Sequence, residues 1–501
     1  MRRKIVGKVF LSFAAFAAFF VCSGPSAVAE DYQRLNINSL SREELLALEM
    51  LTPFQVESIL EYRSKYGDIL SSSELMAIDG FVEENVEALA AVLLFEPSPP
   101  SEGRRTRQVI TARVKKPFAK DGFATTAKYC LTSGKIGVGA VIDNDPGEKF
   151  PDFVSAFASF KGFVAGDFRA RFGQGLAVWK GMSFNSLGEP SALAGRESGI
   201  TPYTSSDEEN YLRGVGWSGK VGATSLNAFA SVKGKSGAVN ASRVFGRWKI
   251  GSTAVCGVDK YGHLWANGGV DFYGSAGHLR CFGELATNER LAPAVKLGAL
   301  WRPVYELEAG WKGWIYAPAY TAPQGASSLK DQIGTEAAVR YTFKRWKFNA
   351  NVQCRWKPSS AQWSFKYRIA AQYDFAEGSS LAYHFRNGQH RFNFKWAAGP
   401  WSFGCRAEGN LSGYGFFGEA SYREPRLEVT ARITYYDTDG WNSRIYLYER
   451  NLPQSFSTMA YYGKGTGAYL VVKYAPVRWC ELWFKLQQNY CSFFTRITIP
   501  G

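Results

Sequence analysis

The stretch from Trp363 to Phe375 alternates without interruption, with an apolar side chain at every odd position and a polar or small one at every even position. A β-strand turns successive side chains to opposite faces, so this stretch has one apolar, aromatic face and one charged face. The same alternation recurs at Ala337–Phe343, Trp346–Trp356, Phe392–Trp396, Trp401–Ala407 and Leu427–Tyr435. Strands of about nine to eleven residues that are apolar outside and polar inside are typical of barrels in outer membranes. The sequence predicts a mainly β fold built around a large antiparallel transmembrane β-barrel; a soluble periplasmic β-sandwich or propeller is the alternative.

The beginning of the chain predicts export from the cytoplasm. A basic start with Arg2, Arg3 and Lys4 precedes the apolar stretch Val9–Val21, and the small residues Ala27–Ala29 suit a cleavage site. These features indicate a signal peptide over residues 1–29. No later stretch approaches the ~20 apolar residues of a membrane-spanning helix, so insertion is expected through strands. We expect an outer-membrane protein of a Gram-negative cell, with its N-terminal domain in the periplasm and the barrel-insertion machinery as a partner.

Charge divides the chain into two parts. Residues 30–95 contain thirteen acidic and four basic residues, a net charge of −9, although the whole chain carries +15. The positive excess therefore lies in the following part, where a cationic lumen or rim would attract anions. Pairing of the basic lumen residues with lumen carboxylates is the alternative. The aromatic content of 15% suits aromatic girdles at two bilayer surfaces.

Residues 30–95 follow a helical period instead of the strand period. Ser41 and Glu44 form a capping box, and Thr52-Pro53 starts a second helix with Thr52 as N-cap. A third helix follows, then the turn Asp79-Gly80 and a fourth helix over Glu83–Leu94. The sequence predicts a small all-α domain here, joined to the barrel by a Pro- and Ser-rich linker over residues 96–107.

This helical region carries a family resemblance. Leu35–Asn38, Ile59–Arg63 and Ile78–Phe81, in that order and spacing, resemble a tandem helix-hairpin-helix domain of the competence DNA-receptor (ComEA-type) family. The resemblance implies contact with DNA phosphates through backbone N–H groups at a helix start. The corresponding DNA- or partner-binding candidates are Thr52, Phe54, Arg63, Gly80 and Phe81.

Two departures from that family leave a second role open. The first hairpin, residues 48–54, has no glycine where the family has two. A domain with a net charge of −9 also repels a polyanion. The region therefore also suits a plug or a protein-docking adaptor.

The barrel is expected over residues 108–501, with roughly fourteen to twenty strands and an even number. Expected strands include Gln108–Lys116 and Phe163–Phe172, with a long interruption over Gly173–Glu209. Because Pro500 cannot donate to a ladder, the last strand is expected to stop before it. Either Phe494 is its effective end, or insertion into the membrane differs here.

A second resemblance covers the start of that interruption. Asp167–Trp179, Gly199–Ser205 and Leu212–Gly214 resemble uncharacterised outer-membrane proteins in which a helix-hairpin-helix module precedes a β-barrel. That group implies a fold and a location, but no activity. The loop and lumen candidates in this region are Arg169, Arg171, Gly173, Gln174 and Gly175.

The sequence predicts neither a catalytic site, a metal site nor a cofactor. The four histidines and the seven cysteines after residue 29 are dispersed, and no nucleophile elbow, phosphate loop or dinucleotide motif is present. The expected function is that of a non-enzymatic barrel with a plug or docking module, which would pass or hold an anionic or amphiphilic substrate. A DNA-uptake component and an outer-membrane enzyme are the alternatives.

Overall fold

The computed structural model describes the barrel region almost completely and the region before it in part. The described residues are 106–181, 187, 189–195, 197–304, 306–326, 330–455 and 458–500. In the earlier region they are 35–40, 44–45, 48, 51, 55–56, 59–60, 62–63, 68–69, 75, 78, 81, 89 and 93–96.

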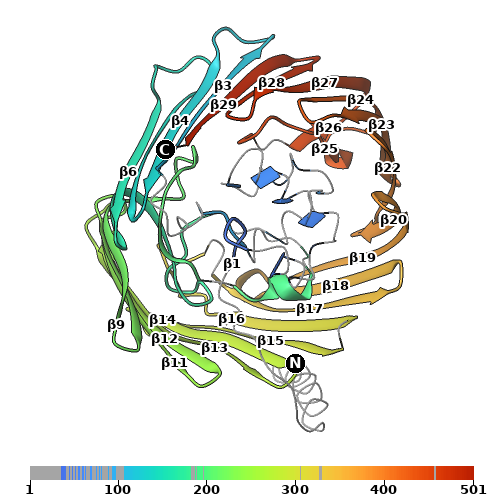
Figure 1. Cartoon of the computed structure of the whole chain (residues 1–501). Helices are drawn as coiled ribbons and strands as arrows, with labels where there is room; N and C mark the ends of the chain where they lie inside the picture. The colour runs from blue at the N-terminus through green and yellow to red at the C-terminus, as the bar shows by residue number, and fades with distance from the viewer. Residues whose placement is uncertain are drawn as a thin grey trace.

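Twenty-four antiparallel strands close into one barrel (Figure 1). The first half consists of β3 (Arg107–Pro117), β4 (Ala124–Ser133), β5 (Ile136–Asn144), β6 (Phe153–Phe160), β7 (Phe163–Arg171), β9 (Leu212–Val221), β10 (Thr224–Ser231), β11 (Ser236–Phe245), β12 (Trp248–Val258), β13 (Leu264–Ala276), β14 (Leu279–Asn288) and β15 (Pro293–Val304). The second half consists of β16 (Leu307–Tyr316), β17 (Gln332–Phe343), β18 (Trp346–Lys357), β19 (Gln362–Ala376), β20 (Ser379–Arg386), β21 (Gln389–Ala398), β22 (Trp401–Asn410), β23 (Gly413–Arg423), β24 (Leu427–Thr438), β27 (Lys464–Val477), β28 (Cys480–Gln487) and β29 (Tyr490–Pro500). The predicted barrel is confirmed, but the estimate of fourteen to twenty strands is wrong.

The barrel closes between its last strand and its first. β29 pairs with β3 from Tyr490–Pro117 to Pro500–Arg107. The expectation that the last strand stops before Pro500 is therefore wrong. Proline is tolerated there because it is the terminal residue of the ladder, where one missing donor costs little.

The two ends of the barrel differ in their connections. At the end where β3 begins and β29 finishes, here called the terminal end, every turn between strands has two or three residues. The three longest connections, between β7 and β9, β16 and β17, and β24 and β27, all lie at the opposite, distal end. The barrel therefore has one smooth end and one end that carries long insertions.

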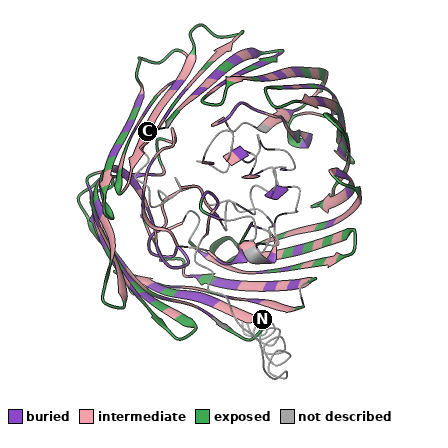
Figure 2. Ribbon diagram, in the orientation of Figure 1, coloured by how far each residue is buried: buried purple, intermediate pink, exposed green. Residues whose placement is uncertain are grey.

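The side chains of the wall alternate between the two faces, as the sequence predicts. Along the strands, buried and exposed residues follow one another (Figure 2). On β19, Trp363, Phe365 and Ile369 are exposed outside, whereas Ala370 on the other face is buried. The outer face carries many exposed aromatic and aliphatic side chains, including Phe348, Phe392, Trp401 and Phe416.

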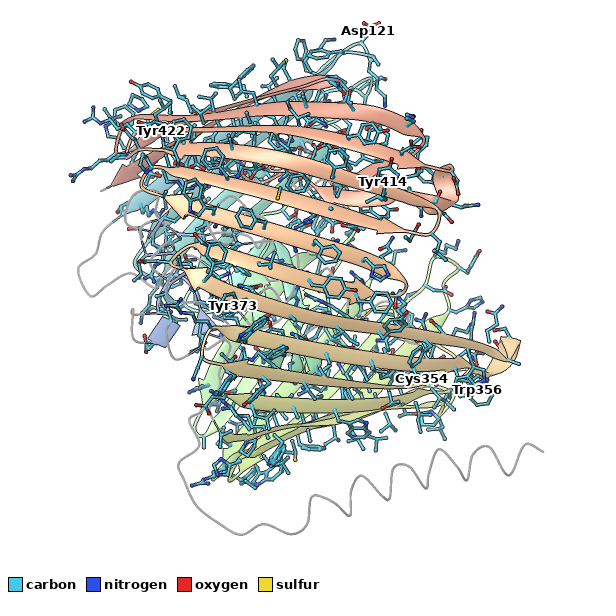
Figure 3. The ribbon with its side chains drawn as sticks, turned by 90° about the vertical axis from the view of Figure 1, so that its right-hand side faces the viewer. Asp121, Cys354, Trp356, Tyr373, Tyr414 and Tyr422 are labelled. Atoms are coloured by element: carbon cyan, nitrogen blue, oxygen red, sulfur yellow. The ribbon has the colours of Figure 1, made fainter. Side chains whose placement is uncertain are left out.

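Aromatic residues mark both ends of this apolar face. The ring centroids of Trp346 and Tyr373 are 4.8 Å apart near the terminal end, and those of Trp356 and Trp363 are 5.9 Å apart near the distal end. Tyr373 and Trp356 lie toward opposite ends of the same wall in Figure 3. Ten residues at ~3.3 Å each, tilted by about 40°, span about 25 Å. That height matches the apolar band of a barrel in a bilayer.

The long connections contain short elements of their own. The connection after β7 contains the 3-10 helix η1 (Pro190–Leu193) and β8 (Gly199–Pro202), which pairs with the distal end of β7. The connection after β24 contains the 3-10 helix η3 (Trp441–Ser443) and the hairpin of β25 (Ile445–Tyr448) and β26 (Thr458–Tyr461). A further 3-10 helix, η2 (Pro358–Ser360), joins β18 to β19. Figure 1 shows η1 and the β25–β26 hairpin within the ring of strands.

The described residues before the barrel share one apolar core. Fourteen of them are buried in a single cluster, among them Ile37, Leu45, Ile59 and Leu75. Helical backbone is present at residues 44–45, 55–56, 59–60, 62–63, 75 and 89. The expected fourth helix does not extend to Leu94, because Leu93–Leu94 form β2, a parallel partner of β1 (Leu35–Asn36).

Among the described residues, no helix is long and apolar enough to cross a membrane.

Candidate functional site in the barrel lumen

Four adjacent strands, β18–β21, carry a group of basic side chains on their inner face. We call Arg355, Lys366, Arg368, Arg386 and Arg391 the cationic cluster. The strand register joins its members, since Arg368 stands opposite Arg386 and Lys366 is two residues from Arg368. Residues that face each other across an antiparallel pair share a face, so these side chains lie together on the inner wall. All five lie in the distal half of their strands.

Few carboxylates accompany the cationic cluster. The Nε of Arg391 donates to the Oε2 of Glu408 at 2.7 Å. A guanidinium N–H of Arg368 donates to the carbonyl of Leu187 in the β7–β9 connection, at 3.3 Å. Within the part of the chain that the structure describes, Arg355, Lys366 and Arg386 form no ion pair. This part of the lumen therefore has a local excess of positive charge.

Other sectors of the inner wall contain ion pairs. Arg432 bonds to Glu419 at 2.7 Å, and Lys473 lies 3.2 Å from Glu481. On the other side, Lys312 lies 2.8 Å from Glu336. The sequence left open whether lumen charges are free or paired, and both arrangements occur in different sectors of the wall.

The connection after β7 is bound to the wall by one buried carboxylate. The backbone N–H groups of Gln174, Leu176 and Ala177 donate to the carboxylate of Glu284 on β14 at 2.6, 3.0 and 3.1 Å. Hydrogen bonds to an ionised acceptor are stronger than neutral ones. The Nζ of Lys296 also donates to the carbonyl of Gln174 at 3.1 Å. This connection is therefore held firmly against β14 and β15.

The predicted candidates Gly173, Gln174 and Gly175 form the centre of this attachment. Gly173 and Gly175 have φ angles of 56° and 87°, which glycine adopts without strain. A Cβ on Gly173 would meet the side chains of Glu284 and Asp271 at 2.9 and 3.1 Å. The structure thus gives these glycines a positioning role that the sequence did not indicate, because their partner Glu284 is about 110 residues away in the chain.

Arg169 and Arg171 lie on β7 just before these glycines. The guanidinium of Arg169 lies 5.6 Å from the ring centroid of Tyr203, and that of Arg171 lies 5.3 Å from that of Trp179. The Nε of Arg171 also donates to the carbonyl of Lys180 at 3.0 Å. Both predicted residues therefore contact the connection itself and are separate from the cationic cluster.

The candidates in the region before the barrel are described only in part. Arg63 donates to the carbonyl of Leu40, and Phe81 is buried in the apolar core of that region. Thr52, Phe54 and Gly80 lie outside the described residues. The contacts of Arg63 and Phe81 are internal to the region and support its own packing.

This region touches the barrel through named side chains. The hydroxyl of Tyr62 accepts a hydrogen bond from Arg496 on the inner face of β29 at 2.7 Å. Asp68 and Arg107, at the start of β3, are 2.7 Å apart. Tyr448, at the end of β25, packs against the apolar core of the region. The pieces of β1 and β2 lie at the terminal end in Figure 3, the end to which Tyr373 and Tyr422 belong.

The β25–β26 hairpin forms a further set of lumen contacts that the sequence did not predict. The Nζ of Lys485 lies 3.2 Å from Glu449 and 2.8 Å from the Oδ1 of Asn451. Arg450 pairs with Glu428. Burial by itself would lower the pKa of Arg450, but the charges of Glu428 and Glu419 raise it above its ordinary value.

Nothing in the described part of the chain forms a group of three or more potential metal ligands. His390 shares a hydrogen bond of 2.8 Å with the hydroxyl of Tyr383 and stacks near Phe385. His384, six residues away, faces the lumen opposite Arg391. The two histidines therefore lie in different surroundings.

No family model and no curated protein matches this chain. Solved structures with a similar fold include the P pilus usher (PapC) translocation pore, 9% identical, covering 79% of this chain and 99% of that one with a TM-score of 0.40. They also include the FrpB iron transporter from Neisseria meningitidis, 8% identical, covering 79% and 82% with a TM-score of 0.37. A third is OpdK of Pseudomonas aeruginosa with vanillate, 10% identical, covering 80% and 99% with a TM-score of 0.29. The similarity concerns the fold and extends to no cargo.

Proposed function

We propose that this protein is a non-enzymatic outer-membrane barrel that admits an anionic substrate through its distal end. In this proposal the region before the barrel, residues 30–95, lies on the periplasmic side and acts as a plug. The distal end faces the outside of the cell, because barrels in outer membranes have short periplasmic turns and longer extracellular loops.

The observation that carries the proposal is the cationic cluster on the inner face of β18–β21. Its five basic side chains face the distal half of the lumen, and three of them, Arg355, Lys366 and Arg386, form no ion pair with any described residue. A channel lined by one sign of charge concentrates ions of the opposite sign and speeds their entry. The paired charges on the other sectors contribute little to such a field.

The outer wall supports the membrane location. Its apolar face, about 25 Å high between aromatic rings, is what a strand barrel presents to lipid. A closed sheet also leaves no strand edge unpaired, which a bilayer requires. The polar residues lie on the opposite face, where water is available.

Three contacts support the plug. Tyr62 and Asp68 come from a region with a net charge of −9, and they bind Arg496 and Arg107 of the barrel. The contact with Tyr448 links the same region to the hairpin that enters from the distal end. None of these three contacts belongs to the strand ladder that closes the barrel, so the plug can be released without unfolding the barrel.

Single-channel recording in planar bilayers tests both parts of the proposal. The mature protein is compared with a variant that lacks residues 30–95. We expect rare, brief openings for the mature protein and a stable conductance for the deletion variant, with a reversal potential in a KCl gradient that shows a preference for chloride. Equal conductance of the two proteins would contradict the plug, and a cation-selective channel would contradict the role of the cationic cluster.

DNA uptake remains the second candidate, because a basic lumen also suits a polyanion. It predicts that the mature protein binds duplex DNA with an affinity that falls steeply as salt rises, and that deletion of residues 30–95 abolishes the binding. Retention of DNA binding by the deletion variant would assign it to the barrel instead, and absence of binding at low salt would exclude this function.

A further inference from the structure

The outer face of β9–β13 is hollowed by small side chains. Two rows of outward residues run around the barrel across these strands. One row is Trp217, Ala228, Val239, Ala254 and Gly268, and the other is Val215, Ala230, Gly237, Cys256 and Ala266. They line an apolar groove with a volume of about 1020 Å³, at the upper end of the ~300–1,000 Å³ typical of sites for small organic ligands.

The opposite wall shows that this hollow is local. On β21–β23, Ala407 stands between Phe392 and Phe416 in the strand register. Both phenylalanines are exposed on the outer face, so a single small residue there is flanked by large rings. On β10–β13, in contrast, small residues succeed one another on four neighbouring strands.

The groove lies in the distal half of the wall, and basic residues stand at its distal end. Lys235, Lys260 and Arg290 lie in the three successive distal connections β10–β11, β12–β13 and β14–β15. Gly237 and Cys256 line the groove next to the first two of these connections. Glu289 also lines the groove and adjoins Arg290 in the third connection.

Two carboxylates near these cations are already engaged. Asp259 accepts hydrogen bonds from the backbone N–H groups of Tyr261 and His263 in its own hairpin, both at 2.8 Å. Glu289 accepts from the N–H of Ala266 at 3.3 Å and lies 3.7 Å from Arg290. Lys235, Lys260 and Arg290 outnumber these two carboxylates, so the distal end of the groove has a positive excess.

Exposed apolar side chains stand at the same hairpins. Tyr261, Leu264 and Leu291 are 72%, 80% and 81% exposed. Aromatic and aliphatic residues beside basic ones are typical of the zone where lipid headgroups meet acyl chains. The groove thus begins at a headgroup zone and continues into the apolar band.

We propose that this groove binds one acyl chain of a phosphorylated glycolipid of the outer leaflet, lipopolysaccharide, whose phosphates bind Lys235, Lys260 and Arg290. Charge complementarity selects this occupant, because phosphate groups at the membrane surface attract clustered basic residues. The proposal rests on the proposed outer-membrane location and orientation, but it does not depend on conduction through the lumen.

Titration of the delipidated, detergent-solubilised protein with purified lipopolysaccharide, followed by native mass spectrometry, tests the proposal. Filling the groove with Ala254→Trp, or independently with Cys256→Trp, is expected to weaken binding at least tenfold. Ala407→Trp on the opposite wall is the matched control and is expected to bind as the unmodified protein does. Retained binding in both groove variants, or equal loss in the control, would overturn the proposal. Heat-dependent mobility on gels identifies any variant that does not fold, and the other groove variant then decides.

The headgroup is tested separately from the chain. The triple variant Lys235→Ala, Lys260→Ala and Arg290→Ala is expected to weaken lipopolysaccharide binding at least tenfold and to leave binding of phosphatidylglycerol within twofold. Equal binding of the two lipids by the unmodified protein would show an ordinary annular phospholipid site and overturn the proposal. A failure of this lipid-binding test has no bearing on the channel recordings, and a channel without anion preference has no bearing on the lipid titration. Failure of the lipid-binding proposal can therefore be distinguished from failure of the proposed function.

Discussion

At the scale of single residues, the lumen is organised by a few charged side chains that bind backbone groups far away in sequence. Glu284 is the clearest case, since its carboxylate accepts three N–H groups from the β7–β9 connection. The arrangement leaves three donors without an acceptor if the carboxylate is lost. A buried donor without a partner costs about 1–3 kcal/mol.

Replacement of Glu284 by glutamine is therefore expected to loosen the β7–β9 connection. We expect a loss of about 2–3 kcal/mol in the free energy of unfolding, because glutamine keeps only one oxygen acceptor and turns an amide N–H toward a backbone donor that the second oxygen had accepted. Urea unfolding of the protein in detergent measures the change. Glu377→Gln, at an exposed turn of the terminal end, is the control and is expected to stay within about 0.5 kcal/mol. An unchanged stability for Glu284→Gln would show that the carboxylate does not hold the connection.

Tyr62 is the second decisive residue, because its hydroxyl accepts from Arg496 on the inner wall. Tyr62→Phe removes this hydrogen bond, which is worth about 1 kcal/mol, and keeps the ring in the apolar core. The open probability in bilayer recordings is expected to rise about fivefold, since 1.4 kcal/mol corresponds to a factor of ten in an equilibrium constant. Tyr474→Phe, on the exposed outer face, should leave gating unchanged. If the two variants behave alike, Tyr62 does not retain the plug.

At the scale of elements, neighbouring strands divide the lumen into sectors with different electrostatics. β18–β21 carry the cationic cluster, whereas β24 and β27–β29 carry paired charges. The difference arises from the strand register, which sets basic side chains beside each other in one sector and opposite carboxylates in the other. Selectivity is thus expected to belong to one sector of the wall.

Charge reversal in that sector tests the assignment. The double variant Lys366→Glu and Arg386→Glu, made in the deletion variant without residues 30–95, is expected to lower the permeability ratio of chloride to potassium below one. Lys344→Glu, at a terminal-end turn, carries a charge change of the same sign outside the cluster and should alter the ratio by less than twofold. Reversal potentials in a KCl gradient measure all three proteins. A similar shift in both variants would indicate a general effect of net charge.

The strands could be predicted from the sequence, whereas the contents of the lumen could not. Alternation marks a strand wherever one face meets an apolar surrounding, so Trp363–Phe375 and Trp346–Trp356 fall within β19 and β18. The strand number was underestimated because alternation is weak in stretches rich in small residues, such as β11. Glu284 and the β25–β26 hairpin escaped prediction because their partners lie far apart in the chain. Gly173–Gly175 were predicted as candidates because glycines allow a flexible backbone after a strand, but the sequence did not identify Glu284 as their neighbour.

At the scale of the whole molecule, the two ends of the barrel differ from each other. One end has turns of two or three residues and the contacts with residues 62 and 68, and the other has the three long connections and the cationic cluster. This asymmetry fixes which end faces the cell exterior in the proposed orientation. The exposed apolar side chains of the outer wall occur toward both ends and do not by themselves distinguish them.

Labelling of cysteines in intact cells checks this orientation. A membrane-impermeant charged maleimide is expected to label Ser412→Cys, at a distal hairpin, and to label Lys344→Cys, at a terminal-end turn, only after the outer membrane is permeabilised. Mass spectrometry of the digested protein identifies the labelled site. Cys405, exposed on the outer wall, is expected to react with a lipid-soluble reagent and not with the charged one. The reverse order for positions 412 and 344 would invert the molecule in the membrane.

The inward path of the β7–β9 and β24–β27 connections also determines what the cell displays. In this structure their chains are engaged with the inner wall, through Glu284 in one case and Lys485 in the other. An antibody or a phage tail fibre that approaches from outside would therefore meet mainly a rim of short hairpins, such as Asn387-Gly388 and Leu411-Ser412. In the proposed orientation, such a protein presents few protruding loops for recognition by a host or a virus, even though its longest connections lie at the distal end.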